Sequence, residues 1–156
     1  MRLLILIWGF IFLTKQGLQA FIVREETQVV HNVISLFKQH MEKIGINRPN
    51  VVMAQIVLET NYLSSKIYKE NHNLFGMKES VFRNHDIGSQ YGHALYPNTN
   101  ASLLDYRDWQ RAMGGHNIES DEEYLYFLDH LPGNRRYATD PNYTDKLKNI
   151  IKILNN

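Results

Sequence analysis

Residues 49–78 read PNVVMAQIVLETNYLSSKIYKENHNLFGMK, and they join an almost wholly apolar helix to a short polar and aromatic segment. Pro49 suits a first helical turn, and Gln55 is the only polar residue between Val51 and Glu59. Such a helix is buried nearly all round. A carboxylate at its end lies near the negative pole of the helix dipole and beside apolar side chains, and both effects raise its pKa. The sequence therefore predicts that Glu59 holds a proton at neutral pH, although a solvated helix-end residue is the alternative.

The composition predicts one compact domain, which we place at residues 23–156, because 156 residues with 44% hydrophobic content suffice for an ordinary core. Cysteine is absent, which excludes disulfides and thiolate metal sites. The formal net charge is +1, and nothing indicates a nucleic-acid partner. The seven His residues are scattered without an HExxH motif, so structural or surface roles are favoured over a zinc site. We expect no metal, no cofactor and no protein partner, and a monomer.

The first 20 residues resemble a secretory signal peptide. Arg2 precedes an unbroken apolar run from Leu3 to Leu13, which is too short to span a bilayer comfortably. A permanent transmembrane helix and a buried core helix are the weaker interpretations. Leu18 makes cleavage after Ala20 unfavourable, so an uncleaved N-terminal anchor is the other alternative. We expect an exported protein that acts in the periplasm, the cell envelope or the extracellular space.

Hydrophobic periodicity predicts a mainly helical chain. Apolar residues at three- and four-residue steps, and the Gly and Pro residues that interrupt them, indicate helices at about 25–43, 49–61, 65–69, 103–113, 122–130 and 141–154. Asp140 is expected to cap the last helix and Pro141 to open it. Residues 75–96 alternate partially between apolar and polar side chains, which indicates a small, irregular β-hairpin. The predicted fold class is α+β, mainly α, with a helical body and a hairpin lobe on either side of a cleft.

Four blocks of the sequence resemble the glucosaminidase family, glycoside hydrolase family 73, over about residues 44–151. They are VVMAQIVLETNYLSSKIYKENHNLFGMK, YGHALYPN, SLLDYRDWQ and YATDPNYTDKLKNII, in this order. The resemblance implies a lysozyme-like fold and hydrolysis of the β-1,4 bond after N-acetylglucosamine in bacterial peptidoglycan. It also implies that Glu59 is the general acid, that Tyr137 lies in the cleft, and that residues 73–76 form the family's NLFG turn.

Residue chemistry supplies candidate substrate contacts, because aromatic faces and side-chain amides are suited to binding sugars. We select Asn73, Phe75 and Tyr106, although Asn73 suits a turn equally and helical spacing favours a core position for Tyr106. Tyr137 lies in an irregular segment, where functional residues concentrate. The sequence leaves open whether Arg135 and Arg136 contact peptide carboxylates or lie free.

The main departure from the family pattern is Ala101, which occupies a position where many members have a second acidic residue. Hydrolysis needs a base or a nucleophile as well as an acid. Glu79 or Asp86 from the hairpin can supply it, or the acetamido group of the substrate can act as nucleophile with support from Tyr137; weak activity is the third alternative. A muramidase, a lytic transglycosylase and an inactive wall-binding protein are the competing functions.

Overall fold

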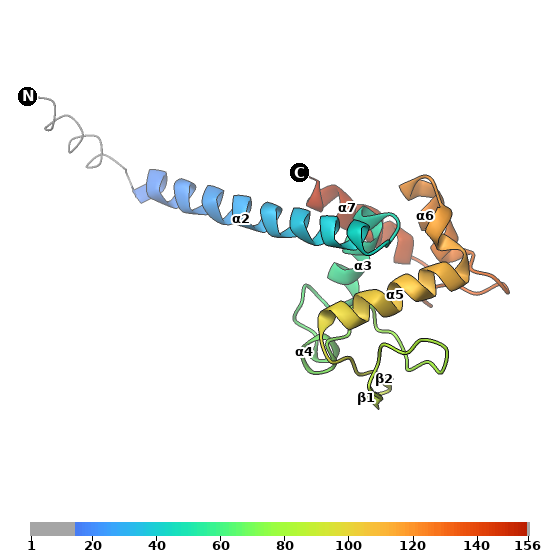
Figure 1. Ribbon diagram of the computed structural model, residues 1–156. Coiled ribbons are helices and arrows are strands. Elements are labelled where there is room, and N and C mark those ends of the chain that lie inside the picture. Colours follow the sequence, from blue (N-terminus) through green and yellow to red (C-terminus); the bar gives the residue numbers. More distant parts are fainter. Residues whose placement is uncertain (1–14, 156) are drawn as a thin grey trace, which may run out of the picture. The chain divides into compact units, whose positions relative to one another are not determined.

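The computed structural model describes residues 15–155, and the described chain divides into two compact units between Leu36 and Phe37. Its elements are helices, apart from one two-stranded sheet, which confirms the predicted α+β, mainly α class (Figure 1). Residues 1–14, which hold most of the predicted signal peptide, lie outside the described residues. No helix within residues 15–155 is both long enough and apolar enough to cross a membrane.

Helix α2, Lys15–Lys43, begins ten residues earlier than the periodicity indicates. The helix that the periodicity predicts at 25–43 is confirmed. Near its C-terminal end Met41 is fully buried, whereas Val30 and Val33 are more than half exposed.

Helix α3, Pro49–Glu59, forms where the sequence predicts it, and residues 51–57 are all buried. Its partners are α6, Asp121–Asp129, and α7, Tyr143–Leu154. Pro49 occupies the first turn, as expected from its fixed φ and missing N–H. Because Gln55 belongs to the buried face, its amide needs partners inside the protein.

Helices α4 (Lys66–Asn71), α5 (Thr99–Met113) and α6 each start at a side chain that caps them. Ser65 accepts a hydrogen bond from Tyr68 N in α4, Asn98 caps α5, and Ser120 caps α6. A short 3₁₀ helix, η1 (Gly115–Asn117), follows α5. The expected opening of α7 is wrong by two residues, because Asp140, Pro141 and Asn142 form a turn before the helix begins.

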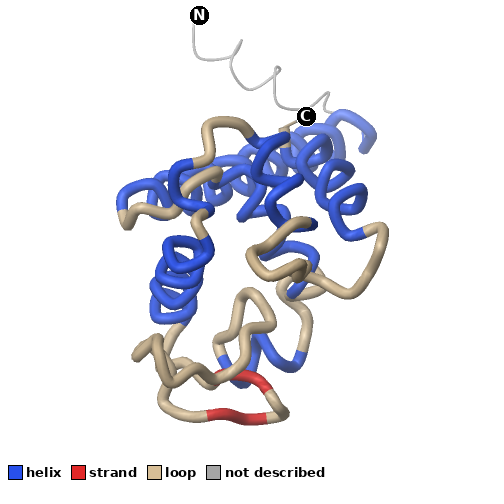
Figure 2. The backbone as a smooth tube through the Cα atoms, turned by 90° about the vertical axis from the view of Figure 1, so that its right-hand side faces the viewer, coloured by secondary structure: helices blue, strands red, loops and turns tan. Residues whose placement is uncertain are grey.

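The hairpin is smaller than predicted. Strands β1, Ser89–Gln90, and β2, His93–Ala94, pair antiparallel through a turn in which Tyr91 and Gly92 both have positive φ. Residues 77–88, expected to contribute to the hairpin, form a loop. In Figure 1, α5 runs between helices α3, α6 and α7 and the lobe that contains α4, β1 and β2, and Figure 2 shows this lobe as mostly loop.

Candidate active site

A left-handed turn immediately after α3 fixes the position of Glu59. Asn61, Tyr62 and Leu63 all have φ between 48° and 60°, a region that costs non-glycine residues energy. Buried Thr60 holds the turn, because its hydroxyl donates to Ile56 O at 2.6 Å and accepts from Leu63 N at 2.9 Å. Asn61 is the first residue of the turn, and Asn tolerates this conformation better than most residues other than glycine.

The carboxyl group of Glu59 is half-buried and has two different oxygens. Burial raises its pKa, and this effect outweighs the hydrogen bond from Tyr143 and the charge of His93, which both lower the pKa. Oε1 accepts the Tyr143 hydroxyl at 2.8 Å. Oε2 faces Gly76, where a Cβ atom would lie 3.4 Å away, and Gly76 also has a φ of +63°. Glycine at position 76 therefore suits both its own backbone and the space beside Oε2.

A buried chain of hydrogen bonds runs from the main chain of Asn47 to Glu59. Gln110 exchanges hydrogen bonds with Asn47 N and O, at 2.8 and 2.9 Å, and donates to the Tyr124 hydroxyl at 2.8 Å. The Tyr124 hydroxyl lies 2.9 Å from that of Tyr106, which is bonded to Gln55 Oε1. Gln55 Nε2 then donates to the Tyr143 hydroxyl at 3.3 Å.

The direction of this chain follows from the main chain of Asn47. A backbone N–H only donates and a carbonyl only accepts, so Gln110 must present its amide NH₂ to Tyr124. Tyr124 accepts there and can donate only to Tyr106, which therefore donates to Gln55. From Gln110 onward, every hydrogen bond in the chain is therefore donated in the direction of Glu59. Because Tyr143 accepts from Gln55, its own hydroxyl hydrogen must point at Oε1 of Glu59.

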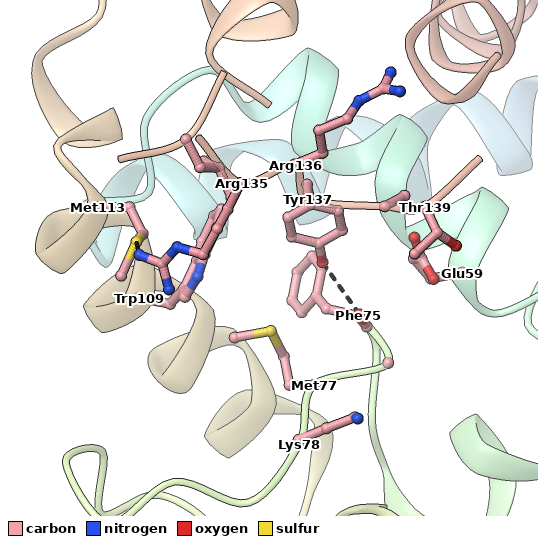
Figure 3. A pocket seen from close by; sticks show the side chains of 13 residues that line it. Glu59, Phe75, Met77, Lys78, Trp109, Met113, Arg135, Arg136, Tyr137 and Thr139 are labelled. Carbon is pink, nitrogen blue, oxygen red and sulfur yellow. Dashed lines mark hydrogen bonds between the residues drawn. The ribbon is translucent and has the colours of Figure 1, made fainter. Parts of the chain in front are cut away.

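A cleft of about 470 Å³ lies beside Glu59 (Figure 3). It is lined from four parts of the chain: the end of α3, the turn at 75–78, one face of α5, and the segment 131–139. The lining residues are Glu59, Phe75, Gly76, Met77, Lys78, Trp109, Met113, Leu131, Arg135, Arg136, Tyr137, Ala138 and Thr139. Glu59 is the only acidic residue among them.

Aromatic rings form one wall of this cleft. Tyr137 packs edge-on against Trp109, with ring centroids 5.2 Å apart, and stacks on Tyr143 at 5.6 Å. Its hydroxyl donates to Phe75 O at 3.1 Å, the bond drawn in Figure 3. Burial raises the pKa of Tyr137 well above its usual value, and the charge of Glu59 raises it further. Tyr137 therefore stays a neutral donor at physiological pH.

The structure brings Glu59, Phe75 and Tyr137 together at the cleft, but it places two other candidates behind it. Asn73 is 2% exposed, and its amide is used by Phe75 N, Met77 N, Met77 O and Ala94 O. Tyr106 is fully buried and stacks on the far side of Phe75, with centroids 4.0 Å apart. Neither Asn73 nor Tyr106 lines the cleft, so the structure does not support direct substrate contact by these two residues. Phe75 does line it, although its side chain is only 2% exposed.

The acidic candidates of the hairpin lie elsewhere. Glu79 is exposed and Asp86 accepts Ser80 N at 3.4 Å, and neither lines the cleft. Ala101 is 9% exposed and belongs to a buried cluster with Ala94 and Tyr96. Ala101, the residue that departs from the family pattern, therefore packs against residues at and after strand β2.

The residues after Ala101 have structural roles that sequence reasoning missed. Ser102 Oγ accepts Leu74 N at 3.0 Å and so anchors the turn beside Glu59. Buried Asp105 accepts Arg83 Nε at 3.0 Å on both oxygens and the Tyr96 hydroxyl at 2.8 Å. Ser102 and Asp105 are polar residues three positions apart on an otherwise apolar face of α5. This pattern could have indicated that both need hydrogen-bond partners inside the protein.

Metal binding finds no support among residues 15–155, where no group of three or more His, Asp or Glu side chains is placed to hold an ion.

No solved structure matched the chain significantly. A similar protein is the N-acetylmuramoyl-L-alanine amidase domain-containing protein of Staphylococcus aureus (strain NCTC 8325 / PS 47), 34% identical over 125 residues. The match covers 66% of this chain and 20% of that protein, so the chain spans about a fifth of the relative's length. The sequence description of the glucosaminidase family, mannosyl-glycoprotein endo-beta-N-acetylglucosaminidase, matches residues 34–156, and the chain therefore belongs to this family.

Proposed function

We propose that the protein is a peptidoglycan hydrolase, an endo-β-N-acetylglucosaminidase that cleaves the β-1,4 bond after N-acetylglucosamine, with Glu59 as the general acid. The observation that carries the proposal is a single carboxyl group of raised pKa at an aromatic-lined cleft. Glycoside cleavage requires a protonated acid beside the leaving oxygen, and aromatic faces suit sugar rings. Family membership supports the same polymer and the same bond. We place the activity in the cell envelope or outside the cell, where this polymer lies.

The hydrogen-bond chain indicates which oxygen of Glu59 carries the acidic proton. Oε1 already accepts from Tyr143, whose hydrogen has no other acceptor because Gln55 presents its NH₂ group. The hydroxyl oxygen of a protonated carboxyl group is a weaker acceptor than its carbonyl oxygen, so a proton on Oε1 would weaken the hydrogen bond from Tyr143. The proton therefore belongs on Oε2, the oxygen beside Gly76, and from there it passes to the leaving oxygen.

The second catalytic group is best supplied by the substrate. No described residue that lines the cleft, apart from Glu59, has a carboxylate to activate water or attack the sugar. The acetamido carbonyl oxygen of N-acetylglucosamine can attack the anomeric carbon as the leaving oxygen takes the Glu59 proton, and water later opens the ring that forms. Tyr137 lines the same cleft, and we propose that its ring supports the acetamido group, because its hydroxyl hydrogen is already donated to Phe75 O.

Product analysis tests the proposed bond. Purified peptidoglycan digested by the wild type is expected to yield fragments with reducing N-acetylglucosamine ends, identified by mass spectrometry after reduction. Reducing muramic ends would indicate a muramidase, and anhydro-muramic ends a lytic transglycosylase. Binding to the polymer without any cleavage would indicate an inactive wall-binding protein.

Substitution of Tyr143 by Phe tests the role of the chain. Loss of the hydroxyl removes a donor that lowers the pKa of Glu59, so the alkaline limb of the activity profile is expected to move to higher pH. The turnover rate is expected to fall about fivefold, because one hydrogen bond of ~1 kcal/mol no longer orients the acid. The measurement is kcat as a function of pH.

Tyr124→Phe is the matched control for this change. It removes an equivalent buried hydroxyl from the same chain, but Tyr143 still donates to Glu59. Both variants are expected to lose stability, whereas only Tyr143→Phe moves the alkaline limb. An equal shift in the two variants would contradict the direct role of Tyr143.

A further inference from the structure

The charges in the cleft do not match an uncharged sugar chain. Lys78, Arg135 and Arg136 line the cleft, and Glu59, which is neutral when it acts as an acid, is the only acidic lining residue. N-acetylated glycan strands carry no charge on their sugar rings. The carboxylates of peptidoglycan belong to the peptides attached to its muramic acid residues, so a cationic cleft suits a strand that carries these peptides.

Arg135 is held in place for such a role. Its main chain forms a bridge with Leu131, through Leu131 N to Arg135 O at 2.9 Å and the reciprocal bond at 3.3 Å. Nε donates to Pro132 O at 2.9 Å, and Nη2 contacts Met113 Sδ at 3.7 Å. In Figure 3 the guanidinium group lies beside Met113 and Trp109, at the opposite side of the cleft from Glu59. A guanidinium fixed at Nε keeps its remaining N–H groups for a carboxylate.

The neighbouring Arg136 is different, although it also lines the cleft. Its guanidinium donates to Asp129 Oδ1 at 2.6 Å and 3.2 Å, and Figure 3 shows it pointing away from Lys78 and Arg135. Among the ion pairs of residues 15–155, none involves Arg135 or Lys78. The two side chains therefore provide positive charge that no carboxylate of the described chain neutralises.

We propose that Arg135 binds a free carboxylate of the peptide that substitutes the glycan strand, with Lys78 adding to the positive charge of the cleft. This subsite rests on the proposed function, because it takes the polymer to be peptidoglycan. It gives the enzyme a preference for strands whose peptides carry unmodified carboxylates. Arg135 is then a specificity residue, separate from the proton transfer at Glu59.

The test compares two substrates that differ only in charge. Peptidoglycan strands are freed of phosphate-bearing polymers with hydrofluoric acid, which leaves the peptides as the source of anionic groups. Half of the preparation is then amidated with carbodiimide and ammonia, so that the peptides remain but their carboxylates become amides. The wild type, Arg135→Gln and the control Arg136→Gln are assayed for kcat and KM on both, and binding is measured with Glu59→Gln and Glu59→Gln/Arg135→Gln.

The subsite predicts that Arg135→Gln raises KM about tenfold on the native strands and leaves KM on the amidated strands unchanged. Arg136→Gln is expected to change KM by the same factor on both substrates, because the charge of Arg136 is already paired with Asp129. Equal effects of Arg135→Gln on both substrates, or a wild type that does not distinguish them, would overturn the subsite. Binding that depends on both the carboxylates and Arg135, without any cleavage by the wild type, would support the subsite and contradict the proposed function.

Discussion

Replacement of Glu59 by Gln is expected to reduce peptidoglycan cleavage by about 10²- to 10⁴-fold, the range that a general acid contributes. Gln has the same shape and can still accept the Tyr143 hydrogen bond, but its amide cannot transfer a proton to the leaving oxygen. The measurement is the initial rate of fragment release from purified peptidoglycan, with mass spectrometry of the products. A variant that cleaves as fast as the wild type would contradict the assignment of Glu59.

The same substitution is expected to leave the fold intact and to stabilise it at high pH. Because burial raises the pKa of Glu59 in the folded state, the native protein binds more protons than the unfolded chain between the two pKa values. The wild type therefore loses folding free energy as pH rises through this window. Glu59→Gln does not lose it, because its amide does not titrate. Urea unfolding should show equal stability of the two proteins below about pH 4 and a more stable variant above the folded pKa of Glu59.

The pH dependence of the wild type follows from the same shift. The acid form of Glu59 is the active one, so the rate is expected to decline as pH rises through its elevated pKa. In the substrate-assisted mechanism no second carboxylate titrates in the cleft. The profile of kcat should then lack an acidic limb from a carboxylate base, and such a limb would indicate that another acidic residue reaches the substrate.

The sequence was sufficient for Glu59, because the properties that define it are local. The apolar residues 51–58 bury the helix, and the position at its end gives the carboxyl group its environment. Phe75 was predicted from the affinity of aromatic faces for sugars, and Tyr137 from its irregular segment and the family resemblance. The structure confirms the helix and places these side chains at one cleft, whereas their roles in binding and catalysis stay predictions.

The partners of Glu59 could not be predicted in this way, because they come from distant parts of the chain. Tyr143 is 84 residues from Glu59, and Gln55 lies 51 residues from Tyr106. Gln55 was visible only as a polar interruption of an apolar helix, and Tyr143 only as an apolar position of the last one. Asn73 and Tyr106 were misassigned for the converse reason, since amide and phenol groups that suit a sugar also suit a buried hydrogen bond.

Replacement of Arg83 by Met is expected to cost about 3–5 kcal/mol of folding free energy, the largest stability change that we predict, because it leaves a buried carboxylate without its cation. Asp105 is fully buried, and both of its oxygens lie 3.0 Å from Arg83 Nε. Arg83 also donates to Lys78 O at 3.3 Å within the loop before β1. Through its bond to Asp105 it connects this loop with α5. A domain of this size has a total stability of roughly 5–15 kcal/mol, and urea unfolding at pH 7 should show the loss clearly.

The pH dependence and a double variant identify the cause of this loss. Burial raises the pKa of Asp105 even with Arg83 beside it, and removal of the cation raises that pKa further. The destabilisation should therefore be smaller in acid, where Asp105 takes up a proton, and should grow as pH rises. Arg83→Met/Asp105→Asn is expected to recover most of the stability at pH 7, because the introduced amide has no charge and can still accept the Tyr96 hydroxyl. A pH-independent loss without recovery in the double variant would mean that Arg83 acts through packing of its aliphatic stem instead of through its charge.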